Sequence, residues 1–312
     1  MNTITEMCRS ALLGAAIGDA LGVPHEFKKS ADIPMHNQIQ MLMPKEYKKT
    51  YPEIPYGTWS DDTSQMLCLV KSLLIGNGVL DLQVFANELL NWRFHGDNQA
   101  GSVVFDCGLA TNAALHRLKQ GAPPKSCGGT DTRNNGNGSL MRVLPAAFLP
   151  LIWNKSYTEA LDVAVNQSLV THGHAIAKAC CLTYASLALE MISSPEDDIQ
   201  NLVNVAFKHS IDWASDDRDL ISAIAEVRRF GQEELPTGSG YVVDTFWSAI
   251  WSMEHGNNLV ECLQLAISLG NDTDTTACVT GGLAGIRHGL ESVPTSWWNS
   301  LRDFHLIPRL ES

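Results

Sequence analysis

The sequence lacks several patterns that mark common classes of protein. Its eight cysteines never occur as a C-x-x-C pair, so zinc-ribbon and thioredoxin folds have no support. Most of these cysteines lie in apolar periodic runs, where a buried reduced thiol is expected. No uninterrupted apolar run approaches membrane-spanning length, and Asp19 and several glycines interrupt the apolar stretch 11–23 that could resemble a signal peptide. These absences favour a cytoplasmic protein.

Positive charge is also scarce. The chain has 22 Lys and Arg residues against 34 Asp and Glu residues, which gives a formal net charge of −12. This balance argues against nonspecific binding to nucleic acid or to an anionic membrane. An anionic ligand would therefore need a local site made of backbone N–H groups or a metal ion. Apolar residues make up 45% of the chain, as is usual for globular proteins.

Strand-like patterns are nearly absent, whereas helical periodicity recurs from end to end. Neither a low-complexity linker nor a repeat of fixed period divides the 312 residues. The pattern predicts an all-α protein with a single compact multi-helix domain over residues 1–312. The expected helices cover residues 4–20, 61–75, 81–94, 101–119, 140–151, 158–170, 175–192, 197–209, 217–229, 242–254, 258–269 and 275–289.

Two short polar stretches each place two carboxylates and several hydroxyl groups directly before an apolar run with helical spacing. They are Trp59-Ser-Asp-Asp-Thr63 and Asn271-Asp-Thr-Asp-Thr-Thr276. One interpretation is that they cap helices, but one side chain per helix is enough for a cap. The remaining carboxylates would repel one another unless a cation held them, and such oxygen ligands suit Mg²⁺ or Mn²⁺. We expect a metal site where the two stretches meet.

Three further segments allow more than one interpretation. Residues 27–58 contain four prolines and lead directly to Trp59, so a flap over the acidic site is one expectation. The glycine-rich stretch 128–139 could direct N–H groups at a phosphate or could be an ordinary flexible loop. It has no Walker A lysine and no preceding strand. Near the N-terminus, Gly14-x-x-x-Gly18 would permit the close approach of a neighbouring helix.

Some single residues are ambiguous by themselves. Glu26 follows a Gly and Pro turn, and a lone loop glutamate is normally solvated. His172 and His174 lie on a turn between two helical runs, where histidines are more often structural than ligands. Tyr241 could be a stacking platform or a core aromatic residue.

Seven motifs occur in a fixed order from Gly14 to about Gly289. They are Gly14-Ala-Ala-Ile-Gly-Asp-Ala-Leu-Gly22 with Pro24 and Glu26, Trp59-Ser-Asp-Asp-Thr63, Phe105-Asp-Cys-Gly-Leu-Ala-Thr111, Asn135-Gly-Asn-Gly-Ser-Leu-Met-Arg142, Thr171-His172, Gly240-Tyr-Val-Val-Asp-Thr245 and Asn271-Asp-Thr-Asp-Thr275. Each motif is weak alone. In this order they resemble the ADP-ribosylglycohydrolase family, which includes dinitrogenase reductase-activating glycohydrolase and the ADP-ribosyl-acceptor hydrolases.

The resemblance implies an all-α fold with a centre of two Mg²⁺ or Mn²⁺ ions. By motif position, the implied metal ligands are Ser60, Asp61, Asp62, Asp272, Asp274 and Thr275. The family usually has threonine at the position of Ser60, and serine keeps the hydroxyl group. Glu26 matches a mobile glutamate near the scissile bond. The positions matched to substrate contacts are Asp106, Asn135, Gly136, Asn137, Gly138, Ser139, Met141, His172 and Tyr241.

The implied activity is the removal of ADP-ribose from a modified protein side chain, with arginine preferred by analogy to bacterial members. Two cations would orient the ribose hydroxyls and activate water, and a carboxylate would stabilise an oxocarbenium-like state at C1″. Either Glu26 or Asp62 would act as the base. Serine-linked ADP-ribose and O-acetyl-ADP-ribose are alternative substrates.

Two alternatives of other classes stay open. A catalytically weak ADP-ribose-binding immunity protein could neutralise a toxin by binding it, although a pure binder would not need the intact acidic stretches. A Mg²⁺-dependent phosphoesterase would release phosphate instead of ADP-ribose. The expected partners are an ADP-ribosylated protein and ADP-ribose, with an ADP-ribosyltransferase or toxin target as a further option. Neither nucleic acid nor membrane is expected.

Overall fold

The computed structural model describes residues 3–310, and within this range the chain is helical and has no β-strand. This result confirms the predicted all-α class. The α-helices of the described range are α1 (Thr3–Gly22), α2 (Asp61–Ile75), α3 (Leu82–His95), α4 (Leu109–Lys119), α5 (Leu149–Ile152), α6 (Tyr157–Leu169), α7 (Ala175–Ser193), α8 (Ile199–Ala214), α9 (Arg218–Glu233), α10 (Val242–His255), α11 (Leu259–Ser268), α12 (Thr273–His288) and α13 (Thr295–Ser300).

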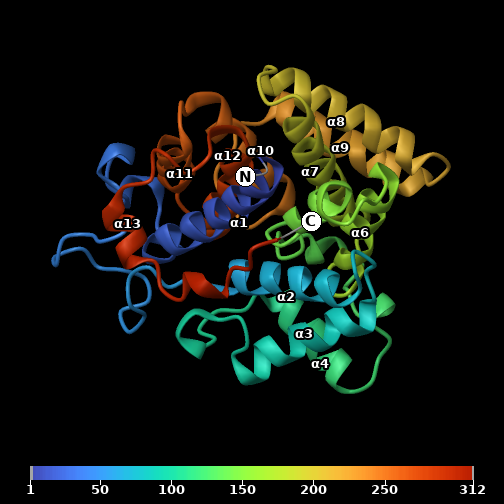
Figure 1. Cartoon of the computed structure of the whole chain (residues 1–312), viewed down its shortest axis with the longest axis horizontal. Coiled ribbons are helices and arrows are strands. Elements are labelled where there is room, and N and C mark those ends of the chain that lie inside the picture. Colours follow the sequence, from blue (N-terminus) through green and yellow to red (C-terminus); the bar gives the residue numbers. More distant parts are fainter. Residues whose placement is uncertain (1–2, 311–312) are drawn as a thin grey trace.

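Helices α1 and α12 pack closely against each other at the centre of the molecule (Figure 1). A Cβ atom added to Gly14 would lie 2.3 Å from the carbonyl oxygen of Gly281, and one added to Gly18 would lie 2.1 Å from that of Ala277. Only glycine permits this approach, so the prediction from Gly14-x-x-x-Gly18 is confirmed. A Cβ on Gly22 would lie 2.4 Å from the Cα of Asp274. The end of α1 therefore meets the start of α12.

Two groups of helices flank this central pair (Figure 1). Helices α2, α3 and α4 lie on one side of α1, and α7 packs against α6, α8 and α9 on another. By length and composition α7 could cross a membrane, which corrects the expectation that no run approaches that length. However, 78% of its apolar window is buried inside the protein. Helix α7 is apolar on all sides because other helices surround it.

Two predicted helices are wrong, and one short helix was not predicted, each for a local reason. The helix expected at 101–119 begins only at Leu109, because Gly101 and Ser102 adopt φ angles of 71° and 57°. The helix expected at 140–151 is a 3₁₀ helix, Leu144–Phe148, followed by the four-residue α5. A proline lies at the start of each of these two pieces and prevents a continuous helix. Helix α13 lies outside the predicted ranges, because its six residues are too few for a periodic pattern.

Residues 27–58 contain 3₁₀ turns and no α-helix. The C-terminal part of the chain fixes this segment, because Trp297 Nε1 donates a hydrogen bond to Gln40 Oε1 at 2.9 Å. The N–H of Arg302 also donates to the carbonyl oxygen of Gly57 at 2.9 Å. Near its end, the segment contacts Glu26 through the hydroxyl group of Tyr51. It therefore lies beside the acidic site, where the expected flap would be.

Candidate active site

The N-termini of α2 and α12 bring the two acidic stretches together. One carboxylate oxygen from each member of two groups of three residues lies within 4.8 Å of the others in its group. The groups are Asp19, Asp62 and Asp274, and Glu26, Asp106 and Asp274. Because Asp62 of the first stretch and Asp274 of the second belong to the same group, the two stretches meet as predicted. Carboxylates from three other segments join them.

Helix capping explains only part of this cluster. The Ser60 hydroxyl oxygen accepts a hydrogen bond from the N–H of Asp62 at 3.4 Å, so Ser60 caps α2. Asp272 occupies the N-cap position of α12, but its side chain makes no capping hydrogen bond. Asp62 Oδ1 and Asp274 Oδ2 are buried and have no hydrogen-bond partner among the described residues. Such orphaned acceptors are costly, and a hard divalent cation fits an all-oxygen donor set of this kind.

Burial dominates the electrostatics of the cluster. It raises the pKa of Asp61, Asp62 and Asp274 well above the usual carboxyl range, and neighbouring carboxylates raise these pKa values further. The pKa of Glu26 is raised to about 9, mainly by burial and to a smaller extent by the charge of Asp106. Without a cation these side chains tend to hold protons. A bound divalent cation would favour their ionised forms.

Asp19 is a buried carboxylate in the last turn of α1, and the sequence alone did not assign it to the site. It accepts hydrogen bonds from the N–H of Ser60 at 2.8 Å and from the N–H and hydroxyl of Thr63 at 2.9 and 2.6 Å. These three bonds hold the start of α2 against α1. Burial raises the pKa of Asp19 to about 6. The feature of the sequence that could have indicated Asp19 is that it is a single acidic residue within an apolar helical stretch.

Glu26 is buried, with only 4% of its surface exposed, so its interpretation as a solvated loop residue is wrong. Its Oε2 accepts a hydrogen bond from the Tyr51 hydroxyl at 2.7 Å. The Tyr51 ring in turn packs edge-on against Phe105 at 5.0 Å between centroids, next to Asp106. The sequence analysis missed Tyr51, because nothing local links it to a glutamate 25 positions earlier.

A cavity of about 530 Å³ opens above the carboxylates. It gathers residues from the loop after α1, the two acidic stretches, the glycine-rich loop and the turn before α7. The predicted site residues that line it are Glu26, Asp61, Asp106, Gly136, Asn137, Gly138, Met141, His172, Asp272 and Thr275. Among its lining residues Arg133 is the only Lys or Arg, and the sequence analysis did not single it out.

Six other predicted residues lie outside this lining. Ser60, Asp62 and Asp274 are buried at the helix N-termini. Ser139 is fully buried, and its hydroxyl oxygen accepts a hydrogen bond from that of Ser168 at 2.9 Å. Its side chain therefore supports the glycine-rich loop from behind.

The start of α10 holds the glycine-rich loop in place. The carbonyl oxygen of Asn135 accepts from the N–H of Val242 at 3.0 Å, and Gly136 forms an isolated β-bridge with Tyr241. Neither Asn135 nor Tyr241 lines the acidic cavity, and the Tyr241 ring borders a smaller neighbouring one. The Asn137 side-chain amide donates to Asp272 Oδ2 at 2.9 Å. This bond ties the loop directly to the second acidic stretch.

Comparisons with known proteins agree with this arrangement. The sequence matches the ADP-ribosylglycohydrolase family over residues 1–312. ADP-ribosylarginine hydrolase Tri1 of Pseudomonas putida (strain GB-1) is 31% identical over 296 residues, which are 94% of this chain and 73% of that protein. ADP-ribosyl-[dinitrogen reductase] glycohydrolase of Rhodospirillum rubrum is 26% identical over 305 residues, which are 96% of this chain and 91% of that protein.

A solved structure, described as an ADP-ribosylglycohydrolase-related protein complex, superposes with a TM-score of 0.71 at 29% identity. The superposition covers 97% of this chain and 94% of that one. The fold and the cavity thus define an all-α protein with an acidic pocket at two helix N-termini. The chain belongs to the ADP-ribosylglycohydrolase family, and as a member of it this protein is a glycohydrolase.

Proposed function

We propose that this enzyme hydrolyses the bond between ADP-ribose and an arginine side chain of a modified cytoplasmic protein, with two Mg²⁺ or Mn²⁺ ions as cofactors. The observation that carries the proposal is a single cavity that joins a glycine-rich loop to an acidic wall, with the orphaned carboxylates of Asp62 and Asp274 buried beside that wall. The names of two relatives, an ADP-ribosylarginine hydrolase and a dinitrogen reductase glycohydrolase, support the class of substrate. The arginine linkage rests on the first of them.

The acidic stretches supply enough oxygen atoms for the cations. The proposed ligands are Ser60, Asp61, Asp62, Asp272, Asp274 and Thr275. When bound, the ions would orient the ribose hydroxyls and polarise a water molecule. Asp19 has three protein donors, so its role is to position Ser60 and Thr63.

We assign Glu26, and not Asp62, as the group that handles the proton. Glu26 lines the cavity, whereas Asp62 does not, and Asp62 Oδ2 already accepts a hydrogen bond from Ser60 at 3.0 Å. In the reaction a water oxygen bonds to C1″ as the bond from C1″ to the guanidine nitrogen breaks. Glu26 takes the water proton and the leaving nitrogen gains one, so water and ADP-ribosylarginine become ADP-ribose and arginine.

The opposite wall of the cavity suits the anionic part of ADP-ribose. In the described part of the chain, no hydrogen bond uses the N–H of Gly136, Gly138 or Ser139. Gly136 and Gly138 line the cavity, so their N–H groups are available for diphosphate oxygens, as an acidic protein without a basic surface requires. Arg133 also lines the cavity, and its exposed guanidinium forms an ion pair with Asp131 at 3.2 Å.

The test uses a protein that is mono-ADP-ribosylated on arginine. Free ADP-ribose is followed by mass with Mg²⁺, with Mn²⁺ and with EDTA. We expect release with a metal and none with EDTA. No release from arginine by the folded enzyme, but release from a serine-linked substrate, would move the linkage to serine. Release of phosphate would indicate a phosphoesterase. If Asp61→Ala with Asp274→Ala left biological activity intact, the binding-protein alternative would hold instead.

A further inference from the structure

Arg142 carries a fully buried guanidinium that makes no ion pair with any described carboxylate. It donates to Gln65 Oε1 at 2.7 Å and to Thr171 Oγ1 at 2.7 Å. It also donates to the side-chain and backbone oxygens of Gln167 at 2.8 and 3.0 Å. A guanidinium has only donors, so each of these partners must act as an acceptor toward it. Because the Arg142 guanidinium only donates, it fixes the direction of the hydrogen bonds around it.

One branch of the network ends at the acidic stretch. Because Gln65 Oε1 accepts from Arg142, the amide nitrogen of Gln65 is the atom that faces Asp61. It donates to Asp61 Oδ2 at 2.8 Å. Asp61 lines the cavity, so the buried guanidinium orients one cavity wall through Gln65.

The other branch ends at His172, which also lines the cavity. Thr171 Oγ1 lies 2.8 Å from His172 Nδ1, and it already accepts from Arg142. The Thr171 oxygen has a second acceptor site and could also accept from an Nδ1–H. Its own buried proton would then have no acceptor among the described residues, because His172 Nδ1 is its only hydrogen-bond partner besides Arg142. The arrangement that satisfies every group has Thr171 donating to Nδ1. Burial lowers the pKa of His172 to about 3, so the imidazole is neutral and has one N–H. That N–H must be on Nε2.

The Nε2 edge of His172 faces the glycine-rich loop. A Cβ on Gly138 would lie 2.9 Å from His172 Cε1 and 3.4 Å from Nε2, and one on Gly136 would lie 3.7 Å from Nε2. No described residue accepts a hydrogen bond from Nε2. The donor therefore points to the part of the cavity where the loop N–H groups are also unused.

We propose that Arg142 is a positioning residue that acts through Thr171 to hold His172 as the Nε2–H tautomer, and that this N–H donates to an oxygen of the anionic ligand in the cavity. The identity of the ligand, ADP-ribose, rests on the proposed function. The tautomer does not rest on it. The network also links both ends of the cavity, because Arg142 orients Asp61 and His172 together.

Nitrogen-15 NMR of histidine-labelled enzyme measures the tautomer directly, with the His172 signals assigned by their loss in His172→Gln. We expect a protonated Nε2 and an unprotonated Nδ1 without any ligand. Arg142→Met would leave several buried acceptors without a donor and can prevent folding, so Thr171→Val serves as the main variant. It removes the hydroxyl and should give a mixture of tautomers. Thr171→Ser keeps the hydroxyl and should restore the wild-type spectrum.

Calorimetry with ADP-ribose gives the second measurement. We expect Thr171→Val to weaken binding about tenfold, as for one lost hydrogen bond to a charged group, and Thr171→Ser to recover most of the affinity. A wild-type Nδ1–H tautomer would overturn the inference even if the enzyme releases ADP-ribose. Equal affinity in Thr171→Val and wild type would also overturn it. An Nε2–H tautomer in an enzyme that does not bind ADP-ribose would support the network and refute the proposed function.

Discussion

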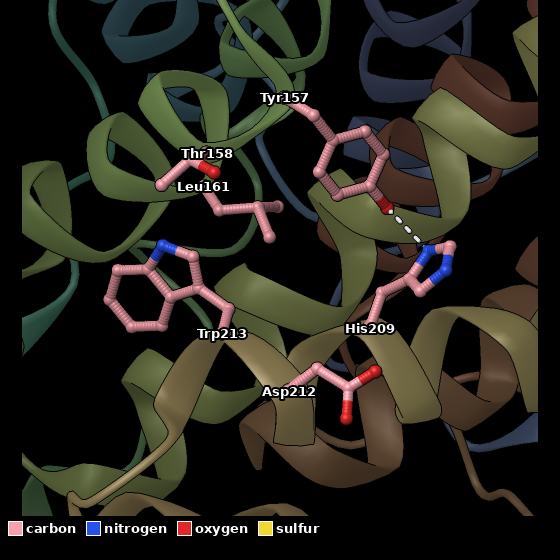
Figure 2. A pocket seen from close by; sticks show the side chains of 6 residues that line it. All are labelled: Tyr157, Thr158, Leu161, His209, Asp212 and Trp213. Atoms are coloured by element: carbon pink, nitrogen blue, oxygen red, sulfur yellow. Dashed lines mark hydrogen bonds between the residues drawn. The ribbon is translucent and has the colours of Figure 1, made fainter.

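Two regions of the molecule satisfy their carboxylates in different ways. The first lies between α6, α7 and α8, beside a cavity of about 350 Å³ (Figure 2). There Glu190 Oε1 lies 2.9 Å from both the Tyr157 hydroxyl and His209 Nδ1. The residues that line this cavity are Tyr157, Thr158, Leu161, His209, Asp212 and Trp213. Here the protein itself supplies the donors for a partly buried acid, the side chain of Glu190.

The second region is the acidic cavity, where the protein supplies too few donors. Asp62 and Asp274 each keep a buried oxygen without a partner, and Glu26 has one side-chain donor, Tyr51. An unpaired buried carboxylate is destabilising, so such an arrangement persists only where something outside the chain compensates it. The comparison shows that a cation site is indicated less by the number of acidic residues than by the number of carboxylate oxygens without a hydrogen-bond donor. Asp19 shows this within the cluster, because three donors already satisfy it.

The sharpest way to break this comparison is to remove one acid from each region. Asp274→Asn should lower kcat with Mg²⁺ by roughly 10³-fold or more, because metal-assisted catalysis accounts for several kcal/mol. Glu190→Gln, the matched control, should keep wild-type activity and lose about 1–2 kcal/mol of stability through its weakened hydrogen bonds. Steady-state kinetics and denaturant unfolding measure the two effects. Equal losses of activity in both variants would show that the two regions do not differ in function.

The metal-free enzyme should become less stable as the pH rises, whereas the Mg²⁺-bound enzyme should not. The folded-state pKa of Glu26 is about 9, against an ordinary value of 4.5. A raised folded-state pKa gives stability that is present at low pH and is lost as the pH rises toward 9. We expect the Tm in EDTA to fall by several degrees between about pH 5.5 and 8.5.

Saturating Mg²⁺ should remove this decline and add about 2.7 kcal/mol of stability at 100 times its Kd. Glu26→Gln in EDTA is the control, because a neutral amide has no proton to lose and the slope should become smaller. A Tm in EDTA that stays constant over this pH range would contradict the account of the acidic cavity. Thermal unfolding followed by circular dichroism is sufficient for all three samples.

The sequence predicted most of the fold because helix signals are local. Apolar spacing defines α2 and α12, Ser60 caps α2, and the acidic stretches start both helices as expected. The errors lie where backbone geometry overrides spacing. The positive φ angles of Gly101 and Ser102 prevent a helix from starting at residue 101. Asp106 therefore lies on the non-helical segment before α4, and there it lines the cavity.

The site was less predictable than the fold, because its supporting contacts join residues far apart in the chain. The spacing of the acidic stretches and the order of the motifs indicated the residues that line the cavity. The partners of these residues left no local pattern: Asp19 binds Thr63, and Arg142 reaches Gln65 and Thr171. The available signal was a polar residue within an apolar run. Such a residue is expected to be buried and hydrogen-bonded, but the sequence does not show which residue it bonds to.

The smallest expected effect separates the two tyrosines that donate to a glutamate, Tyr51 to Glu26 and Tyr157 to Glu190. The Tyr51 hydroxyl lowers the pKa of Glu26, so Tyr51→Phe should raise that pKa and shift the acidic limb of the pH–rate profile to higher pH. The loss of one hydrogen bond predicts a decrease in activity at neutral pH of about two- to tenfold. Tyr157→Phe removes the corresponding donor to Glu190 and should lower stability by about 1 kcal/mol with an unchanged profile. If the two profiles were identical, Tyr51 would only support residues 27–58, and Glu26 would not set the pH dependence of the reaction.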